Sequence, residues 1–207
     1  MIDKFLKAKH WQLFLLTFGI PMIFQFIMMD SMISNIGTES KSELIMTSDY
    51  MNFFPIIVII YMGVLFGWFW SISIGLQTKI PRNIKMKTKK FKIFFFIPLV
   101  YIFFISLFIG GVFSGIKLNG TEPSVGYVIG MIGIILPLHL LSMFGIFYSI
   151  YFVAKTLKTV ELQKEVNFGD FASDFFILWF YFIGIWIIQP KINKIAKYKN
   201  TITNIRI

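Results

Sequence analysis

Cysteine is absent from the 207 residues of the chain. Its absence excludes disulfide bonds, thiol nucleophiles and thiolate metal sites. The sequence also lacks the HExxH, GxGxxG, GxxxxGKS/T and GxSxG patterns of zinc proteases, dinucleotide-binding proteins, NTPases and serine hydrolases. We therefore expect no catalytic residue, no bound cofactor and no metal site.

Charged side chains are also scarce, because only 14% of the residues are Asp, Glu, Lys or Arg, against about 25% in a typical soluble domain. They collect in short segments, and apolar runs of about 20 residues separate most of these segments. A helix needs about 20 apolar residues to cross a hydrocarbon core about 30 Å thick, since each residue rises about 1.5 Å. The sequence therefore predicts an all-α integral membrane protein that crosses the membrane several times.

The apolar runs predict a bundle of four transmembrane helices plus a short fifth hydrophobic helix, in one polytopic domain that covers residues 1–207. The four predicted spans are residues 11–29, 52–76, 93–116 and 125–154. A basic loop, residues 77–92, joins the second span to the third. The fifth apolar run, residues 175–189, is followed by a basic tail, residues 190–207.

The basic loop holds the densest positive charge in a chain whose net charge is +10. Nucleic-acid binding is not expected, because the loop lacks the interleaved aromatic residues of a base-stacking surface. Cations beside anionic lipid each contribute about 1 kcal/mol to membrane attachment. We therefore interpret the loop as a topology determinant and lipid anchor, formed by Arg82, Lys85, Lys87, Lys89, Lys90 and Lys92.

The distribution of cations predicts the orientation of the chain. The N-terminal segment, residues 79–92 and the linker 155–172 together hold thirteen cations, whereas the loops 30–50 and 117–124 together hold two. Cytoplasmic loops of membrane proteins collect Lys and Arg. We therefore expect a cytoplasmic N-terminus in a plasma membrane or a bacterial inner membrane.

The fifth apolar run conflicts with this distribution, because a full crossing would place the five cations of the tail outside. Its uninterrupted core, residues 175–188, would be about 21 Å long as a helix, which is shorter than the hydrocarbon core. A spanning and a re-entrant arrangement both stay open. We favour partial insertion with a bend at Gly184 and a cytoplasmic tail.

Two acids, Asp170 and Asp174, precede this run and are one helical turn apart. Paired carboxylates can bind a hard cation, but such sites take six or more oxygen ligands. Acidic residues also favour the amino end of a helix. We expect both acids to cap the last hydrophobic helix.

His139 is the one ionisable residue in the middle of a predicted span, and Ser142 lies about one turn away on the same helical face. A Ser–His nucleophile would need an orienting acid, which the sequence does not offer. A proton-sensing or ligand-sensing role stays open. We favour a neutral histidine that is hydrogen-bonded to another helix, with Gln25 or Tyr101 as its partner. The candidate intramembrane polar site is His139, Ser142 and Gln25.

Small residues recur about every fourth position on three of the predicted spans. Such ridges let helix backbones approach closely inside a membrane. We expect them to pack helices within one subunit, and a seam between copies is the alternative. The ridge residues are Gly63, Gly67, Ser71 and Gly75, then Ser106, Gly110 and Ser114, then Gly126 and Gly130.

These features favour a non-catalytic function, namely an accessory or scaffold subunit that docks a partner at the membrane. An oligomeric pore or channel, or a membrane-disrupting effector, is the first alternative, and a transporter component is the second. An enzyme is the least supported class, because the spans lack the ionisable groups on which membrane catalysis depends. The expected partners are a bilayer with anionic lipid at the basic face, and either a second copy or another membrane protein.

Overall fold

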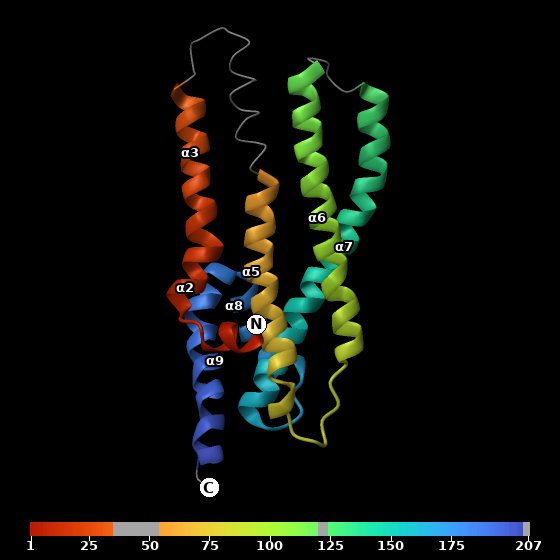
Figure 1. Cartoon of the computed structure of the whole chain (residues 1–207). Coiled ribbons are helices and arrows are strands. Elements are labelled where there is room, and N and C mark those ends of the chain that lie inside the picture. Colours follow the sequence, from red (N-terminus) through yellow and green to blue (C-terminus); the bar gives the residue numbers. More distant parts are fainter. Residues whose placement is uncertain (35–53, 120–123, 205–207) are drawn as a thin grey trace.

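The computed structural model describes residues 1–34, 54–119 and 124–204 (Figure 1). Every regular element in these residues is helical, so the predicted all-α fold is confirmed for the described part of the chain. The first elements are α1 (Ile2–Lys7), α2 (His10–Phe14), the π-helical turn η1 (Leu15–Gly19) and α3 (Ile20–Ser34). The middle of the chain forms α5 (Phe54–Gly75), the 3₁₀ turn η2 (Gln77–Lys79), α6 (Thr88–Asn119) and α7 (Val125–Leu162). The chain continues with α8 (Phe168–Trp179) and α9 (Tyr181–Asn204).

Four helical stretches in the described residues are long and apolar enough to cross a membrane. They are His10–Asp30, Pro55–Lys79, Thr88–Gly111 and Ile129–Leu162. Each of the four predicted spans overlaps one of them. Residues 52 and 53 of the second predicted span, residues 35–50 of the first loop and residues 120–123 of the loop 117–124 lie outside the described residues.

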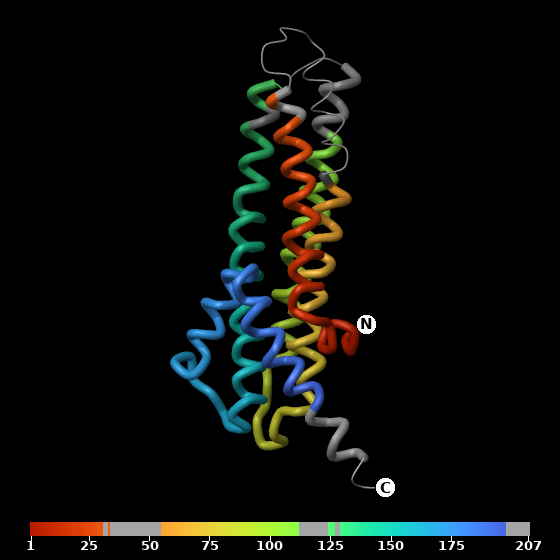
Figure 2. The backbone as a smooth tube through the Cα atoms, turned by 90° about the vertical axis from the view of Figure 1, so that its left-hand side faces the viewer, coloured from red at the N-terminus to blue at the C-terminus, as the bar shows by residue number. Residues whose placement is uncertain are grey.

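Helices α3, α5, α6 and α7 rise side by side, and α1, α2, α8 and α9 lie toward the lower end of the molecule (Figures 1 and 2). The N-terminus, the basic loop and the link between α7 and α8 all lie toward this lower end. The buried core is in the same half, because α1, α2, α8 and α9 cover α5 and α7 there. The largest fully buried apolar side chains are Trp68, Ile72, Leu76, Phe91, Leu157, Phe171, Leu178, Ile185, Ile188 and Ile192.

The small-residue ridge of α5 packs against the short helix α1 rather than against a long neighbouring helix. A Cβ atom added to Gly67 would lie 2.7 Å from Cζ of Phe5, and one added to Gly75 would lie 2.5 Å from Cγ2 of Ile2. The Ser71 hydroxyl between them donates to the Gly67 carbonyl at 2.7 Å. By contrast, nothing lies within 4 Å of a Cβ at Gly63. The ridge is therefore the surface of α5 against which the N-terminal helix α1 packs.

The other ridge residues divide into packed and open positions. A Cβ at Gly110 on α6 would lie 2.9 Å from the ring of Pro55 on α5, so these two helices touch closely there. Nothing lies within 4 Å of a Cβ at Gly126 or Gly130 on α7. The side chain of Ser114 lies outside the described residues.

Helices α6 and α7 cross at a glycine that the sequence analysis did not single out. A Cβ at Gly145 would lie 2.7 Å from the Phe94 carbonyl oxygen and 2.9 Å from Cδ of Pro98. Below the crossing, the rings of Phe91 and Phe152 stack with centroids 4.6 Å apart. Above the crossing, the two helices diverge (Figure 1).

The fifth apolar run forms two helices rather than one. Helix α8 ends at Trp179, Phe180 leaves helical geometry with ψ at 63°, and α9 begins at Tyr181. The predicted bend at Gly184 is wrong, because the break lies four residues earlier. A Cβ at Gly184 would collide with the Ile177 carbonyl oxygen, so glycine is needed there for α9 to pass the backbone of α8. The run is therefore a helical hairpin, and its apolar part in α9, residues 181–188, is only about 12 Å long.

We predict that Gly67→Leu lowers the free energy of unfolding by about 1–3 kcal/mol, because the new side chain overlaps the Phe5 ring. Gly63→Leu is the matched control, since it makes the same change one turn away in open space. Both variants gain the same helix propensity, so their difference reports the contact with α1. Thermal unfolding in detergent measures it, and equal stability of the two variants would contradict the packing described here.

Candidate functional site

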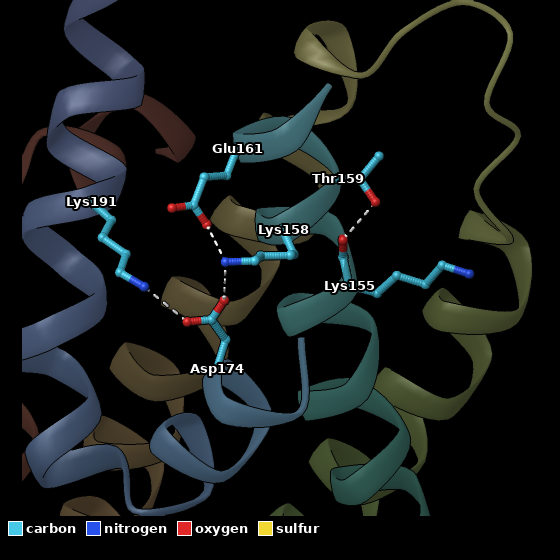
Figure 3. Close-up of polar contacts among 6 residues, drawn as sticks. All are labelled: Lys155, Lys158, Thr159, Glu161, Asp174 and Lys191. Carbon is cyan, nitrogen blue, oxygen red and sulfur yellow. Dashed lines mark hydrogen bonds and ion pairs between the residues drawn. The ribbon is translucent and has the colours of Figure 1, made fainter. Parts of the chain in front are cut away.

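Four charged side chains meet where α7, α8 and α9 come together, and they form what we call the ion-pair cluster (Figure 3). Lys158 and Glu161 come from α7, Asp174 from α8 and Lys191 from α9. Lys191 Nζ donates to Oδ1 of Asp174 at 2.9 Å. Lys158 Nζ lies 3.9 Å from Oδ2 of Asp174 and donates to Oε2 of Glu161 at 2.9 Å. Two cations thus balance two anions.

The burial of the cluster is uneven. The side chain of Asp174 is 4% exposed, whereas those of Lys158 and Lys191 are 21% and 36% exposed. Oδ2 of Asp174 is buried without a hydrogen bond and has the Lys158 ammonium as its nearby charge. A buried carboxylate needs such compensation, since charge is expensive to remove from water. The cluster therefore ties the hairpin of α8 and α9 to the end of α7.

Helix α8 begins with a capping box, one turn before Asp174. The Asn167 backbone N–H donates to Oδ2 of Asp170 at 2.8 Å, and together they form a capping box. The predicted capping role of Asp170 is thus confirmed. The same prediction for Asp174 is wrong, because it lies one turn further along and points to Lys191 on the returning helix α9.

The end of α7 is closed by Gln163, which has a positive φ of 52°. Its backbone N–H donates to the Thr159 carbonyl at 2.9 Å, and its side-chain amide donates to the Val160 carbonyl at 2.7 Å. These bonds satisfy carbonyl groups that a helix end leaves without partners. The turn of the chain from α7 toward α8 therefore begins at a defined residue.

A second polar group joins α9 to the N-terminal helix, and we call Gln189 and Asn193 the amide clamp. The Gln189 side chain is fully buried and accepts from the Trp68 indole N–H at 2.7 Å. Its Nε2 donates to the carbonyls of Phe5 at 2.9 Å and Ala8 at 2.8 Å. Nδ2 of Asn193 donates to the carbonyls of Leu6 at 2.8 Å and Ala8 at 3.1 Å.

The amide clamp was missed by the sequence analysis, although a signal for it exists. Two carboxamides four residues apart lie on one face of a helix. Gln189 also ends an otherwise apolar run, where a polar side chain needs a buried partner. The spacing alone does not identify the partner, since the carbonyls that accept these bonds belong to residues more than 180 positions away.

The structure pairs His139 with one of its two expected partners. Nδ1 of His139 and the hydroxyl of Tyr101 are 3.1 Å apart and join α7 to α6. Ser142 is buried at 2% exposure, one turn from His139. Gln25 is exposed on α3, which packs against α5. The three residues of the candidate polar site are therefore not brought together.

The six residues proposed as a lipid anchor all have exposed side chains. They are Arg82, Lys85, Lys87, Lys89, Lys90 and Lys92. The Lys92 ammonium lies 5.9 Å from the ring centroid of Trp70, a distance typical of a cation–π contact. The loop thus presents its charge outward at the lower end of the molecule.

Two further polar side chains, Thr159 and Lys155, lie on α7 close to the ion-pair cluster. The Thr159 hydroxyl donates to the carbonyl of Lys155 at 2.8 Å, and the Lys155 side chain points away from Asp174 (Figure 3). In the described part of the chain, no three His, Asp or Glu side chains come close enough together to hold a metal ion. The chain matches no protein-family model, no curated protein and no solved structure. A function for the chain is therefore inferred from its own geometry.

We predict that Lys191→Met lowers the free energy of unfolding by about 3 kcal/mol, because it removes the hydrogen-bonded partner of a buried carboxylate. Lys194→Met is the control, since Lys194 is exposed on the same helix, and its expected effect is within about 0.5 kcal/mol.

The double variant Asp174→Asn/Lys191→Met tests the same link, because it removes the buried charge together with its partner. It is expected to be more stable than Lys191→Met alone. Thermal unfolding of the three variants in detergent gives the comparison. A double variant that is no more stable than Lys191→Met would mean that the ion pair is not what holds α9.

Proposed function

We propose that the chain is a non-catalytic, multi-pass membrane protein that acts as a scaffold subunit and docks a transmembrane helix of a partner protein. The observation that carries this proposal is an open glycine face on the first part of α7. Nothing lies within 4 Å of a Cβ added to Gly126, Gly130 or Gly133, whereas Gly145 on the same helix is in close contact with α6.

The spacing of these glycines places them on one face of α7. Small residues on one face let a second helix approach closely, and such packing drives helix association where lipid supplies no hydrophobic force. The neighbouring side chains are apolar and exposed, with Ile129 at 65% and Leu136 at 54%. The face is therefore suited to a helix from another polypeptide.

The proposed location is a plasma membrane or bacterial inner membrane, with the N-terminus in the cytoplasm. The arrangement of the chain supports this orientation. The N-terminal segment and the basic loop lie toward one end of the molecule (Figures 1 and 2). Because the last apolar run is a hairpin, its cationic tail also returns toward that end. The basic tail then lies on the cytoplasmic side with the other basic segments, as the positive-inside rule requires.

We predict that a membrane-impermeant thiol reagent labels Ser124→Cys but not Lys197→Cys in intact cells. The chain has no cysteine of its own, so each variant carries a single reactive site. Both variants are expected to react after the membrane is permeabilised, which controls for accessibility. Equal labelling of the two sites in intact cells would show that the last hydrophobic segment crosses the membrane.

We predict that a photoreactive amino acid at position 129 captures a single partner protein in native membranes. Ile23 on α3 is the matched control, since its exposure of 62% is close to the 65% of Ile129. Gly130→Leu is expected to abolish the adduct by filling the glycine face. It should leave thermal stability unchanged, because the space around Gly130 is open.

Three outcomes of this experiment would overturn the docking proposal. The first is an adduct with the mass of two copies of this chain, which would favour the oligomeric pore. The second is equal capture from positions 129 and 23. The third is an adduct that persists in the Gly130→Leu variant.

A further inference from the structure

An apolar groove of about 870 Å³ lies between α6 and α7, where the two helices diverge above their crossing. Its walls include Ile93, Phe96, Val100, Phe104, Leu138 and Leu141. The polar hydroxyl of Tyr101 in this wall is held by His139. The groove is thus a continuous hydrocarbon surface along the outside of the helix pair.

Positively charged side chains lie at the lower end of the groove. Lys89 and Lys90 precede Ile93 by four and three residues, so they lie on the groove side of α6 one turn below its last apolar wall residue. Both side chains are exposed, and they belong to the first turn of a 32-residue helix, whose amino end attracts anions. No acidic residue occurs between 79 and 119.

We propose that this groove binds one anionic phospholipid of the cytoplasmic leaflet, with its phosphate at Lys89 and Lys90 and its acyl chains along α6 and α7. The site rests on the membrane location proposed above and is independent of partner docking. From Ile93 to Phe108 the groove is about 22 Å long at helical rise. This length exceeds the depth of one leaflet, about half of a 30 Å core.

The lining of the groove favours lipid over a transmembrane helix of a partner. Helix packing in membranes relies on small residues, whereas the groove is lined mostly by Phe, Ile, Leu and Val. Flexible acyl chains fit such a surface, and the two ammonium groups complement a phosphate.

Native mass spectrometry of the purified full chain tests the site with two probes, phosphatidylglycerol and phosphatidylcholine. Lys89→Gln/Lys90→Gln is expected to weaken phosphatidylglycerol binding about 30-fold, since each cation beside anionic lipid contributes roughly fivefold. Binding of phosphatidylcholine, whose headgroup has no net charge, should weaken much less. Lys85→Gln/Lys87→Gln removes the same charge from the exposed loop ahead of α6 and should change either affinity less than about threefold.

A second variant tests the groove itself. Val100→Trp fills the groove from a half-exposed position and is expected to displace both lipids, whereas Ile23→Trp on α3 should leave both bound. Equal loss of phosphatidylglycerol in the two double lysine variants would mean diffuse attraction to the loop and would overturn the site. Undiminished lipid binding by Val100→Trp would also overturn it. Neither result affects capture from position 129, which tests the docking face.

Discussion

One buried carboxamide, that of Gln189 on α9, makes three hydrogen bonds and so joins α9 to both α5 and α1. It accepts from the Trp68 indole on α5 and donates to two carbonyls at the end of α1. A helix of six residues leaves most of its carbonyls without partners, and a buried carbonyl without a donor is destabilising. Gln189, with Asn193 beside it, supplies those donors. The position of α1 on the glycine ridge of α5 therefore depends on where α9 lies.

The position of α9 depends in turn on the hairpin and on the ion-pair cluster. Gly184 lets α9 pass the backbone of α8, and Lys191 reaches the buried carboxylate of Asp174. The lysines of this cluster are partly exposed, so their charges remain partly hydrated while the acid is enclosed. The lower half of the molecule is thus held together by the ion pairs of Asp174 as well as by the hydrogen bonds of Gln189 and Asn193.

The upper half of the molecule differs, because its large apolar side chains are exposed rather than buried in a protein core. Large apolar side chains such as Ile23, Phe104 and Ile134 are exposed there on helices long enough to cross a membrane. In the proposed setting the bilayer covers these side chains, and lipid takes over the role that a protein core has elsewhere. The open glycine face of α7 and the groove beside α6 are then two different surfaces. The glycine face suits a close-packed helix, and the groove suits flexible acyl chains beside Lys89 and Lys90.

The sequence by itself determined the helical class, the four long apolar helices and the segregation of cations, because each depends on local composition and on the rise of a helix. The sequence also predicted Tyr101 as one of two possible partners of His139, because apolar helices offer few polar partners. Only the tertiary structure decided the break at Phe180, the turning of Asp174 toward Lys191 and the burial of Gln189. These features arise from contacts between helices that the chain brings together from up to 184 residues apart. A residue's local pattern shows that it needs a partner, but which partner it meets depends on how the helices pack.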